Sequence, residues 1–296
     1  MDGVFVIDKP AGLTSHDVVS RARRILAERS IGHLGTLDPM ATGVLPLVVG
    51  RMTRLAQFFA AVEKRYEGEI RLGFATTTYD AEGEALGESG PVGISMGEIE
   101  AVGSRFRGAI EQKPPPFSAK KIGGVPAYKL ARRQQPVALA AVPVHVYELE
   151  LGPLQGELLG FRARVSSGTY LRSIAHELGA ALGVGGHLHR LRRTAAGEFS
   201  LADALTLDAL EERRRSGTLA EAAVHPRRLL PEFPAVTANE ESEAAIRNGR
   251  PVNLPDFSRA KYIKVFRGQT ELIAIAARIA GTLFQPKVVL SGKGKS

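Results

Sequence analysis

Hydrophobic residues recur along this chain with two different periods, and together these periods predict strands and helices in one fold. A period of two, in which apolar and polar residues alternate, is typical of strands with one buried face. It is clearest from Tyr66 to Phe74. Short apolar runs or the same alternation predict further strands at 4–7, 142–151 and 161–165.

Helical spacing, with apolar residues three and four positions apart, marks other segments. It predicts helices after Thr14 and after Ser95, each of which can cap the helix that follows it. The segments from Leu55 to Val62 and from Leu171 to Leu182 have the same spacing. Because strands and helices follow one another without a strict strand–helix–strand repeat, we predict an α+β fold with a mixed or antiparallel sheet.

A change of pattern near the C-terminus predicts a second domain. The segment 225–234, HPRRLLPEFP, carries three prolines. A short helix at 240–248 and three strands at 262–266, 271–276 and 282–290 are predicted after it. We therefore expect a large domain in residues 1–230 and a small β-rich domain in residues 231–296.

Composition narrows the possible partners. The net charge is +8, and residues 231–296 alone contain 10 Lys and Arg against 6 Asp and Glu. A basic excess of this size favours a nucleic acid as partner. The chain has no cysteine, which excludes disulfides, thiolate metal sites and cysteine nucleophiles. Neither a signal peptide nor a membrane span of about 18 apolar residues is present, so we expect a soluble, cytoplasmic protein.

The glycine-rich segment 32–43, GHLGTLDPMATG, is the most informative for chemistry. Pro39 restricts the backbone of Asp38 and so helps to hold its carboxylate in place. A carboxylate fixed in this way can serve as a nucleophile or as a base. The residues alone favour an ordinary turn in which Asp38 caps a helix or bonds its own backbone.

Three other segments could bind an anionic or aromatic ligand. Tyr170 and Arg172 lie where a predicted strand gives way to a helix, so they could stack on a base and pair with a carboxylate, although a core tyrosine and a surface arginine are also possible. The run 186–193, GHLHRLRR, could contact phosphates or be an edge strand protected by charge. A zinc site at His187 and His189 has no evident third or fourth ligand. The segment 113–121 is expected to be a basic loop.

Taken together, these segments resemble the TruB family of pseudouridine synthases. The stretches that match, in the family's order, are DKPAGLTS at 8–15, GHLGTLDPMATG at 32–43, KRY at 64–66, TYDAEG at 78–83 and SGTYLR at 167–172. The resemblance covers residues 3–200 well. It implies a pseudouridine synthase catalytic domain on a mixed sheet, and the tail is similar, less closely, to the RNA-binding PUA-like module of bacterial members.

The resemblance also implies roles for single residues. Asp38 takes the place of the essential aspartate, and Arg172 that of the arginine which pairs with it and should keep it ionised. The substrate-binding residues implied are His33, Tyr66, Asp80, Tyr170, Arg172 and Leu191. We expect the RNA backbone to be contacted by Lys9, Lys120, Arg190, Arg192 and Arg193.

The implied substrate is the uridine at position 55 in the T-loop of tRNA, which must leave its stack to be rebuilt. No motif for a metal, redox or nucleotide cofactor is present, so we expect none, and we expect a monomer without an obligate protein partner. Asp38 would begin cleavage either as a nucleophile or by removing a ribose proton. Rival interpretations are the related RNA-guided synthase subunit, a tRNA chaperone and a structural protein of a ribonucleoprotein.

Overall fold

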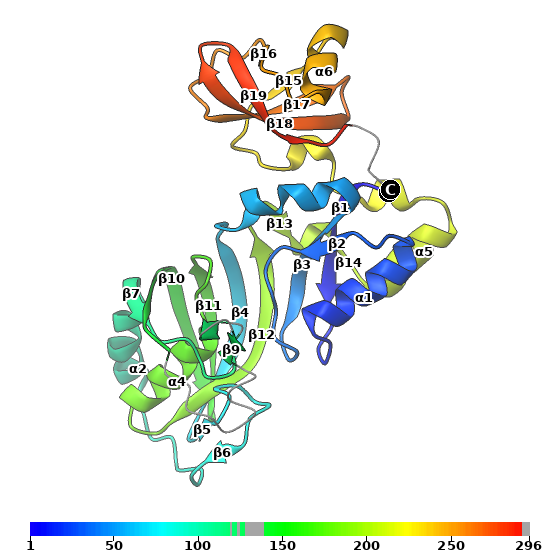
Figure 1. Ribbon diagram of the computed structural model, residues 1–296. Coiled ribbons are helices and arrows are strands. Elements are labelled where there is room, and N and C mark those ends of the chain that lie inside the picture. The colour runs from blue at the N-terminus through cyan, green and yellow to red at the C-terminus, as the bar shows by residue number, and fades with distance from the viewer. Residues whose placement is uncertain (119, 123–124, 128–138, 292–296) are drawn as a thin grey trace.

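The computed structural model describes residues 1–118, 120–122, 125–127 and 139–291, and its main feature is one large mixed sheet (Figure 1). The strands run in the order β14-β1-β3-β12-β4-β11-β10-β7, with β2 paired to β3 and β13 to β12. The β1–β14 and β3–β12 pairs are parallel and the other pairs are antiparallel. The predicted α+β fold with a mixed sheet is confirmed. The strands of this sheet are β1 (Gly3–Lys9), β2 (Ile31–His33), β3 (Thr42–Val49), β4 (Lys64–Leu72), β7 (Gly108–Gln112), β10 (Val142–Gln155), β11 (Leu158–Val165), β12 (Gly186–Ala196), β13 (Phe199–Ser200) and β14 (Ala204–Leu205).

Two groups of helices cover one face of this sheet. Near β1 and β3 lie α1 (Ser15–Leu26) and α5 (Leu207–Arg215), which share an apolar cluster with these strands. Near β10 and β11 lie α2 (Met96–Gly103) and α4 (Leu171–Ala181), which share a second cluster. Tyr66 and Leu191 pack against both clusters, so the two groups meet above the central strands β4 and β12.

The opposite face is covered only at one end. There, β1 and β3 pack against the 3-10 helix η1 (Gly50–Phe59) and against a second sheet, so these two strands are buried on both faces. Strands β4, β11 and β10 have one buried face, and polar residues alternate with the buried ones along each of them. A continuous apolar run and an alternating run therefore occur in the same sheet because its two ends are covered differently.

The second sheet has five strands in the order β15-β17-β18-β19-β16 and forms the upper part of the molecule in Figure 1. It contacts η1 through a cluster of three aromatic rings, Phe58, Phe233 and Tyr262, whose centroids are 5.3–5.6 Å apart. The elements of this part are β15 (Ala235–Thr237), α6 (Glu240–Arg247), β16 (Val252–Asn253), β17 (Tyr262–Arg267), β18 (Glu271–Ala280) and β19 (Leu283–Val289).

Several elements differ from the sequence-based prediction. The helix predicted from Leu55 to Val62 is the 3-10 helix η1, and Val62 lies beyond it, against Gly197. The predicted strands at 142–151 are one strand, β10, whose β-bulges shift the phase of its alternation. Helix α5 was not predicted. The remaining short elements are β5 (Ala75–Thr76), β6 (Ala85–Leu86), β8 (Lys121–Ile122), β9 (Val125–Pro126), η2 (Ser104–Phe106), η3 (Leu201–Asp203), η4 (Leu219–Ala222) and η5 (Pro226–Arg228).

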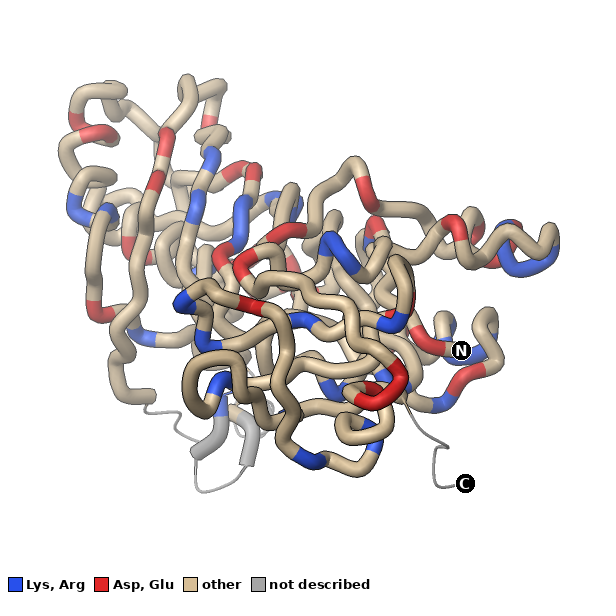
Figure 2. Tube along the Cα trace, turned by 90° about the horizontal axis from the view of Figure 1, so that it is seen from above, with Lys and Arg blue, Asp and Glu red and all other residues tan. Residues whose placement is uncertain are grey.

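Charged residues of both signs are interspersed along the whole trace (Figure 2). The distribution of charge along the trace therefore does not locate a binding site, and individual side chains have to be considered. Among the described residues, no helix is long and apolar enough to cross a membrane.

Candidate active site

A cavity of about 610 Å³ opens above β4 and β12, where the two groups of helices meet. A volume of this size is typical of a site for a small organic group. Seven predicted site residues line the cavity, and they come from four segments of the chain: His33 and Asp38, Tyr66, Tyr170 and Arg172, and Leu191 and Arg193.

The loop that carries Asp38 is fixed by hydrogen bonds to each of its carbonyl groups from Gly35 to Pro39. Ser15, the first residue of α1, both donates to Leu37 O (3.1 Å) and accepts from Leu37 N (2.8 Å). Arg193 of β12 donates to the carbonyls of Gly35 (2.9 Å) and Thr36 (3.4 Å). The carbonyl of Asp38 accepts from Ala41 N, and that of Pro39 from Gly12 N and Lys9 Nζ.

Close backbone packing explains why glycine ends this loop. Gly43 has a φ of +98°, and a Cβ there would lie 2.2 Å from Arg193 O in the neighbouring strand β12. Any larger residue would push β3 and β12 apart at the point where the loop enters the sheet. The strand pairing and the loop therefore depend on the same glycine.

The carboxylate of Asp38 is paired with Arg172, as the resemblance implied. Arg172 Nη2 donates to Asp38 Oδ1 at 3.0 Å, and Arg172 Nε lies 2.9 Å from Asp38 Oδ2. On its other side, Arg172 Nη1 lies 3.3 Å from a carboxylate oxygen of Asp80 and donates to Thr78 O. Arg172 and Asp80 are buried, whereas the Asp38 side chain keeps about a third of its exposure (34%) and faces the cavity.

Burial determines the direction in which the pKa of Asp38 moves. Loss of solvation raises this pKa above its usual value, Arg172 lowers it, and the charge of Asp80 raises it again. Arg172 acts in the expected direction, toward the ionised carboxylate, but the loss of solvation is the larger effect. Because Arg172 divides its charge between two carboxylates, it offsets only part of the desolvation of Asp38.

The aromatic residues of the cavity are held by main-chain contacts. Tyr170 caps α4, and the amide of buried Gln112 closes a pair of hydrogen bonds with its backbone, one to Tyr170 O (3.0 Å) and one from Tyr170 N (2.8 Å). Tyr66 lies on β4, directly opposite Arg193 of β12. His33 ends β2, and burial together with nearby Arg193 lowers its pKa, which favours a neutral ring.

Two of the five residues expected to contact the RNA backbone are buried instead. Lys9 has no exposed surface, and its ammonium donates to Pro10 O and Pro39 O. Arg193 is 1% exposed, and its guanidinium donates to three main-chain carbonyls, including that of Val44. This placement contradicts a surface contact with phosphate, because both side chains support the loop of Asp38.

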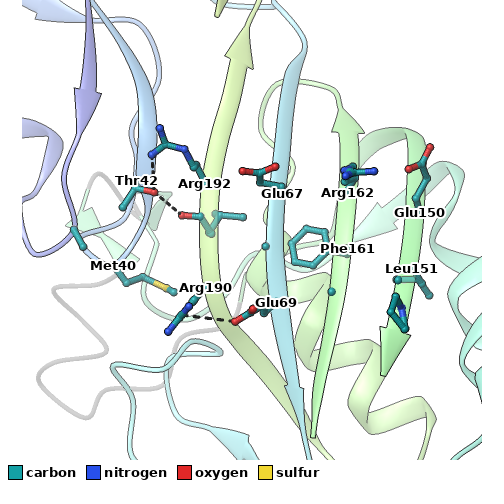
Figure 3. Close-up of a pocket in the computed structure, with 16 residues that line it drawn as sticks. Met40, Thr42, Glu67, Glu69, Glu150, Leu151, Phe161, Arg162, Arg190 and Arg192 are labelled. Carbon is teal, nitrogen blue, oxygen red and sulfur yellow. Dashed lines mark hydrogen bonds and ion pairs between the residues drawn. The ribbon is translucent and has the colours of Figure 1, made fainter. Parts of the chain in front are cut away.

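The other three basic residues are accessible, but two of them point away from Asp38. Successive residues of a strand point to opposite faces, and Arg190 and Arg192 lie on the face opposite the cavity (Figure 3). There they border a second hollow of about 800 Å³, and they pair with Glu69 (3.7 Å) and Asp8 (2.8 Å). Lys120 is exposed in the loop before β8. Strand β12 is central, so it is not the charged edge strand that the sequence also allowed.

No cluster of metal ligands occurs in the part of the chain that the structure describes. His187 is buried, and its Nδ1 lies 3.2 Å from Phe74 O. The sequence reasoning missed Ser15 and Gln112, which position the loop and Tyr170. Ser15 ends the matched stretch at 8–15, but nothing in the sequence marks its role or that of Gln112, because a serine at a helix start and a glutamine before prolines are common.

Comparison with known proteins identifies the family. The model of the TruB family pseudouridylate synthase N-terminal domain matches residues 23–171, and that of the tRNA pseudouridylate synthase B C-terminal domain matches residues 172–231. The chain is 49% identical to tRNA pseudouridine synthase B of Solibacter usitatus over 98% of this chain and 100% of that protein. It is 41% identical to the same-named protein of Bacillus cereus over 93% of this chain and 92% of that protein.

Among solved structures, a chain in the crystal structure of a Cbf5-Nop10-Gar1 complex has a TM-score of 0.72 at 26% identity and covers 98% of this chain and 85% of its own. The fold is thus that of a pseudouridine synthase. The chain belongs to the TruB family of pseudouridylate synthases.

Proposed function

We propose that this enzyme converts uridine to pseudouridine at position 55 in the T-loop of tRNA, with Asp38 as the catalytic carboxylate. The observation that carries the proposal is the Asp38–Arg172 pair at the wall of the 610 Å³ cavity. Relatives that match nearly the whole chain are named tRNA pseudouridine synthase B, which supports tRNA as the substrate.

The reaction breaks the bond from the ribose to N1 of uracil, turns the base and forms a new bond from the ribose to C5. C5 then loses its proton and N1 gains one, so that the product is an isomer of uridine. A base in a folded loop must first leave its stack, and this costs a few kcal/mol. Tyr66 is proposed to stack on the flipped base, while Leu191 and Tyr170 complete its pocket. Asp38 starts the cleavage, either by attacking the substrate or by removing a ribose proton.

The remaining assignments follow from position. Arg172 orients Asp38, and Asp80 orients Arg172. His33 helps to hold the displaced base. Lys9 and Arg193 act on the substrate only through the Asp38 loop, and Lys120 is available to phosphates. We propose residues 1–230 as the catalytic domain and residues 231–296 as a PUA-like RNA-binding domain.

We also propose that the enzyme acts as a cytoplasmic monomer on the T-arm without a metal, a cofactor or an obligate protein partner. The similarity to a protein crystallised with Nop10 and Gar1 is 26% identity, whereas similarity to the tRNA pseudouridine synthase B sequences reaches 49% over essentially their full length. A stand-alone enzyme is therefore better supported than an RNA-guided synthase subunit.

The test is to incubate the enzyme with unmodified tRNA transcript and to map pseudouridine by carbodiimide primer extension. Asp38→Asn keeps an oxygen for Arg172 but removes the carboxylate, so we expect tRNA binding to persist and turnover to fall by about 1000-fold or more. A transcript with cytidine at position 55 should give no product. If wild type binds the transcript and leaves position 55 unmodified, the proposed function is wrong.

A further inference from the structure

Cations on the two faces of the central strands are neutralised to different degrees. On the open face, Arg190 pairs with Glu69 (Figure 3). Arg192 of the same face pairs with Asp8. On the cavity face, Lys64 and Arg193 have no carboxylate within ion-pair distance among the residues that the structure describes. The wall of the cavity beside β4 therefore has an uncompensated positive charge.

Lys64 is the group of this wall that has no acceptor. It is the first residue of β4, two positions before Tyr66 on the same face, and it lines the cavity although only 8% of it is exposed. Its ammonium makes no hydrogen bond or ion pair with any described residue. Arg193 differs, because three main-chain carbonyls already accept its hydrogen bonds.

A second polar atom of the same wall also has no partner. Nδ1 of His33 is buried without a hydrogen bond among the described atoms, and both His33 and Lys64 are close enough to Arg193 for its charge to lower their pKa values. Buried charges are normally paired, because removing them from water is costly. Burial lowers the pKa of Lys64 to about 8, so at neutral pH most molecules still hold this unpaired cation.

The missing counter-charge has an evident source if the substrate is RNA, so the inference rests on the proposed function. A flipped nucleotide brings its two flanking phosphates to the mouth of the cavity together with its base. Lys64 and Tyr66 are two strand residues apart, about 7 Å, which is comparable with the reach from a base to the phosphate of its own nucleotide. We propose that Lys64 is the phosphate-binding residue of this cavity and holds a phosphodiester group that flanks the flipped uridine.

Two variants separate this contact from a general loss of positive charge. Lys64→Met removes the ammonium and keeps the length of the side chain. Arg65→Met removes the neighbouring charge, which is exposed and points to the opposite face. Both are made in the Asp38→Asn background, and the dissociation constant of T-arm RNA is measured over a range of salt concentrations.

We expect Lys64→Met to weaken binding by about tenfold or more and to reduce the salt slope by about 0.7–0.9, the value for one phosphate contact. Lys64→Arg should restore most of the affinity. Arg65→Met should change the dissociation constant by less than about threefold. Lys64→Met should not melt at a lower temperature than its parent, because it removes a buried unpaired charge. An unchanged affinity or salt slope in Lys64→Met would overturn the proposal.

Neutral phosphates in the RNA identify the partner of Lys64. Two RNAs carry a single methylphosphonate, one on the 5′ side and one on the 3′ side of the target uridine. One of these RNAs should bind the parent about tenfold more weakly than the natural RNA does. In the Lys64→Met variant, the same methylphosphonate should cause no further loss of affinity. If the methylphosphonates weaken binding to the parent and to Lys64→Met by the same factor, Lys64 meets the base or another group and the proposal is wrong. Because these are binding measurements, they remain informative even if wild type makes no pseudouridine.

Discussion

The charge of Asp38 is the residue-scale property on which the proposed reaction depends. Burial raises the pKa of this carboxyl, Arg172 and Lys9 lower it, and Asp80 raises it. The reaction needs the ionised form, so kcat/KM should fall as the pH decreases through the raised pKa, above the range of an ordinary aspartate.

Removing the charge of Asp80 should therefore move the fall in kcat/KM, which is the acid limb of the pH profile, to lower pH. In Asp80→Asn, Arg172 no longer divides its charge between two carboxylates, so Asp38 stays ionised in more acidic solution. The measurement is kcat/KM against pH for both enzymes. Glu82→Gln, which removes a more exposed carboxylate of the same loop, is the matched control and should move the limb less. A limb that stays in place or moves to higher pH would show that Asp80 does not act on Asp38 through its charge.

Charged residues show where prediction from sequence fails at this scale. The Asp38–Arg172 pair was expected from the motifs, and it is present. Lys9 and Arg193 were expected on the surface, because lysine and arginine are rarely fully buried. Their burial depends on carbonyl groups of the Asp38 loop, and those groups are placed by the strand register, which no single sequence displays.

At the scale of elements, α1 positions the Asp38 loop through the hydroxyl of Ser15. In Ser15→Ala, Leu37 loses both of its bonds to this hydroxyl. We expect a stability loss of about 1–3 kcal/mol and a fall in kcat of about 10–100-fold, because small displacements of a catalytic group are costly. KM should change little, since Ser15 is only 2% exposed and its hydroxyl is occupied by the main chain of Leu37. Steady-state kinetics with tRNA transcript and thermal unfolding measure the two effects.

The control for this variant removes a helix cap that lies elsewhere. Thr206 caps α5 because its hydroxyl oxygen accepts a hydrogen bond from Ala209 N, and Thr206→Ala should cost about 1 kcal/mol without an effect on kcat. If both variants lose similar stability and keep full kcat, Ser15 has only a structural role.

The elements themselves were predictable where one local signal dominates. The capping boxes of Thr14 with Asp17 and of Ser95 with Glu98 begin α1 and α2 where the pattern placed them. The two-residue strands β13 and β14 are too short to have a period, and only their pairing partners define them. The phase of β12 is also interrupted by a register shift between Leu188 and Arg190, which obscures which arginines face the cavity.

At the scale of the whole molecule, the two sheets share one apolar cluster. Val48 of β3, Leu55 of η1 and Ile275 of β18 belong to it. Lys264 of β17 is buried and donates to the carbonyls of Arg227 and Leu229, which lie before the second sheet. Because so much of the contact is buried, we expect the chain to unfold in one cooperative transition, although the sequence suggested two separate domains.

Breaking the contact should separate the two parts. Phe58→Ala removes the ring that packs against Phe233 and Tyr262 and should cost about 2 kcal/mol, less than a fully buried phenylalanine. Calorimetry should then show a lower-melting transition for the second sheet. The kcat for pseudouridine formation at saturating tRNA should stay unchanged. Phe257→Ala is the matched control, because that ring is 87% exposed and its loss should leave the unfolding curve unchanged. Two transitions already present in wild type would mean that the shared cluster does not couple the sheets, and the second sheet would then be free to bind RNA independently of the first.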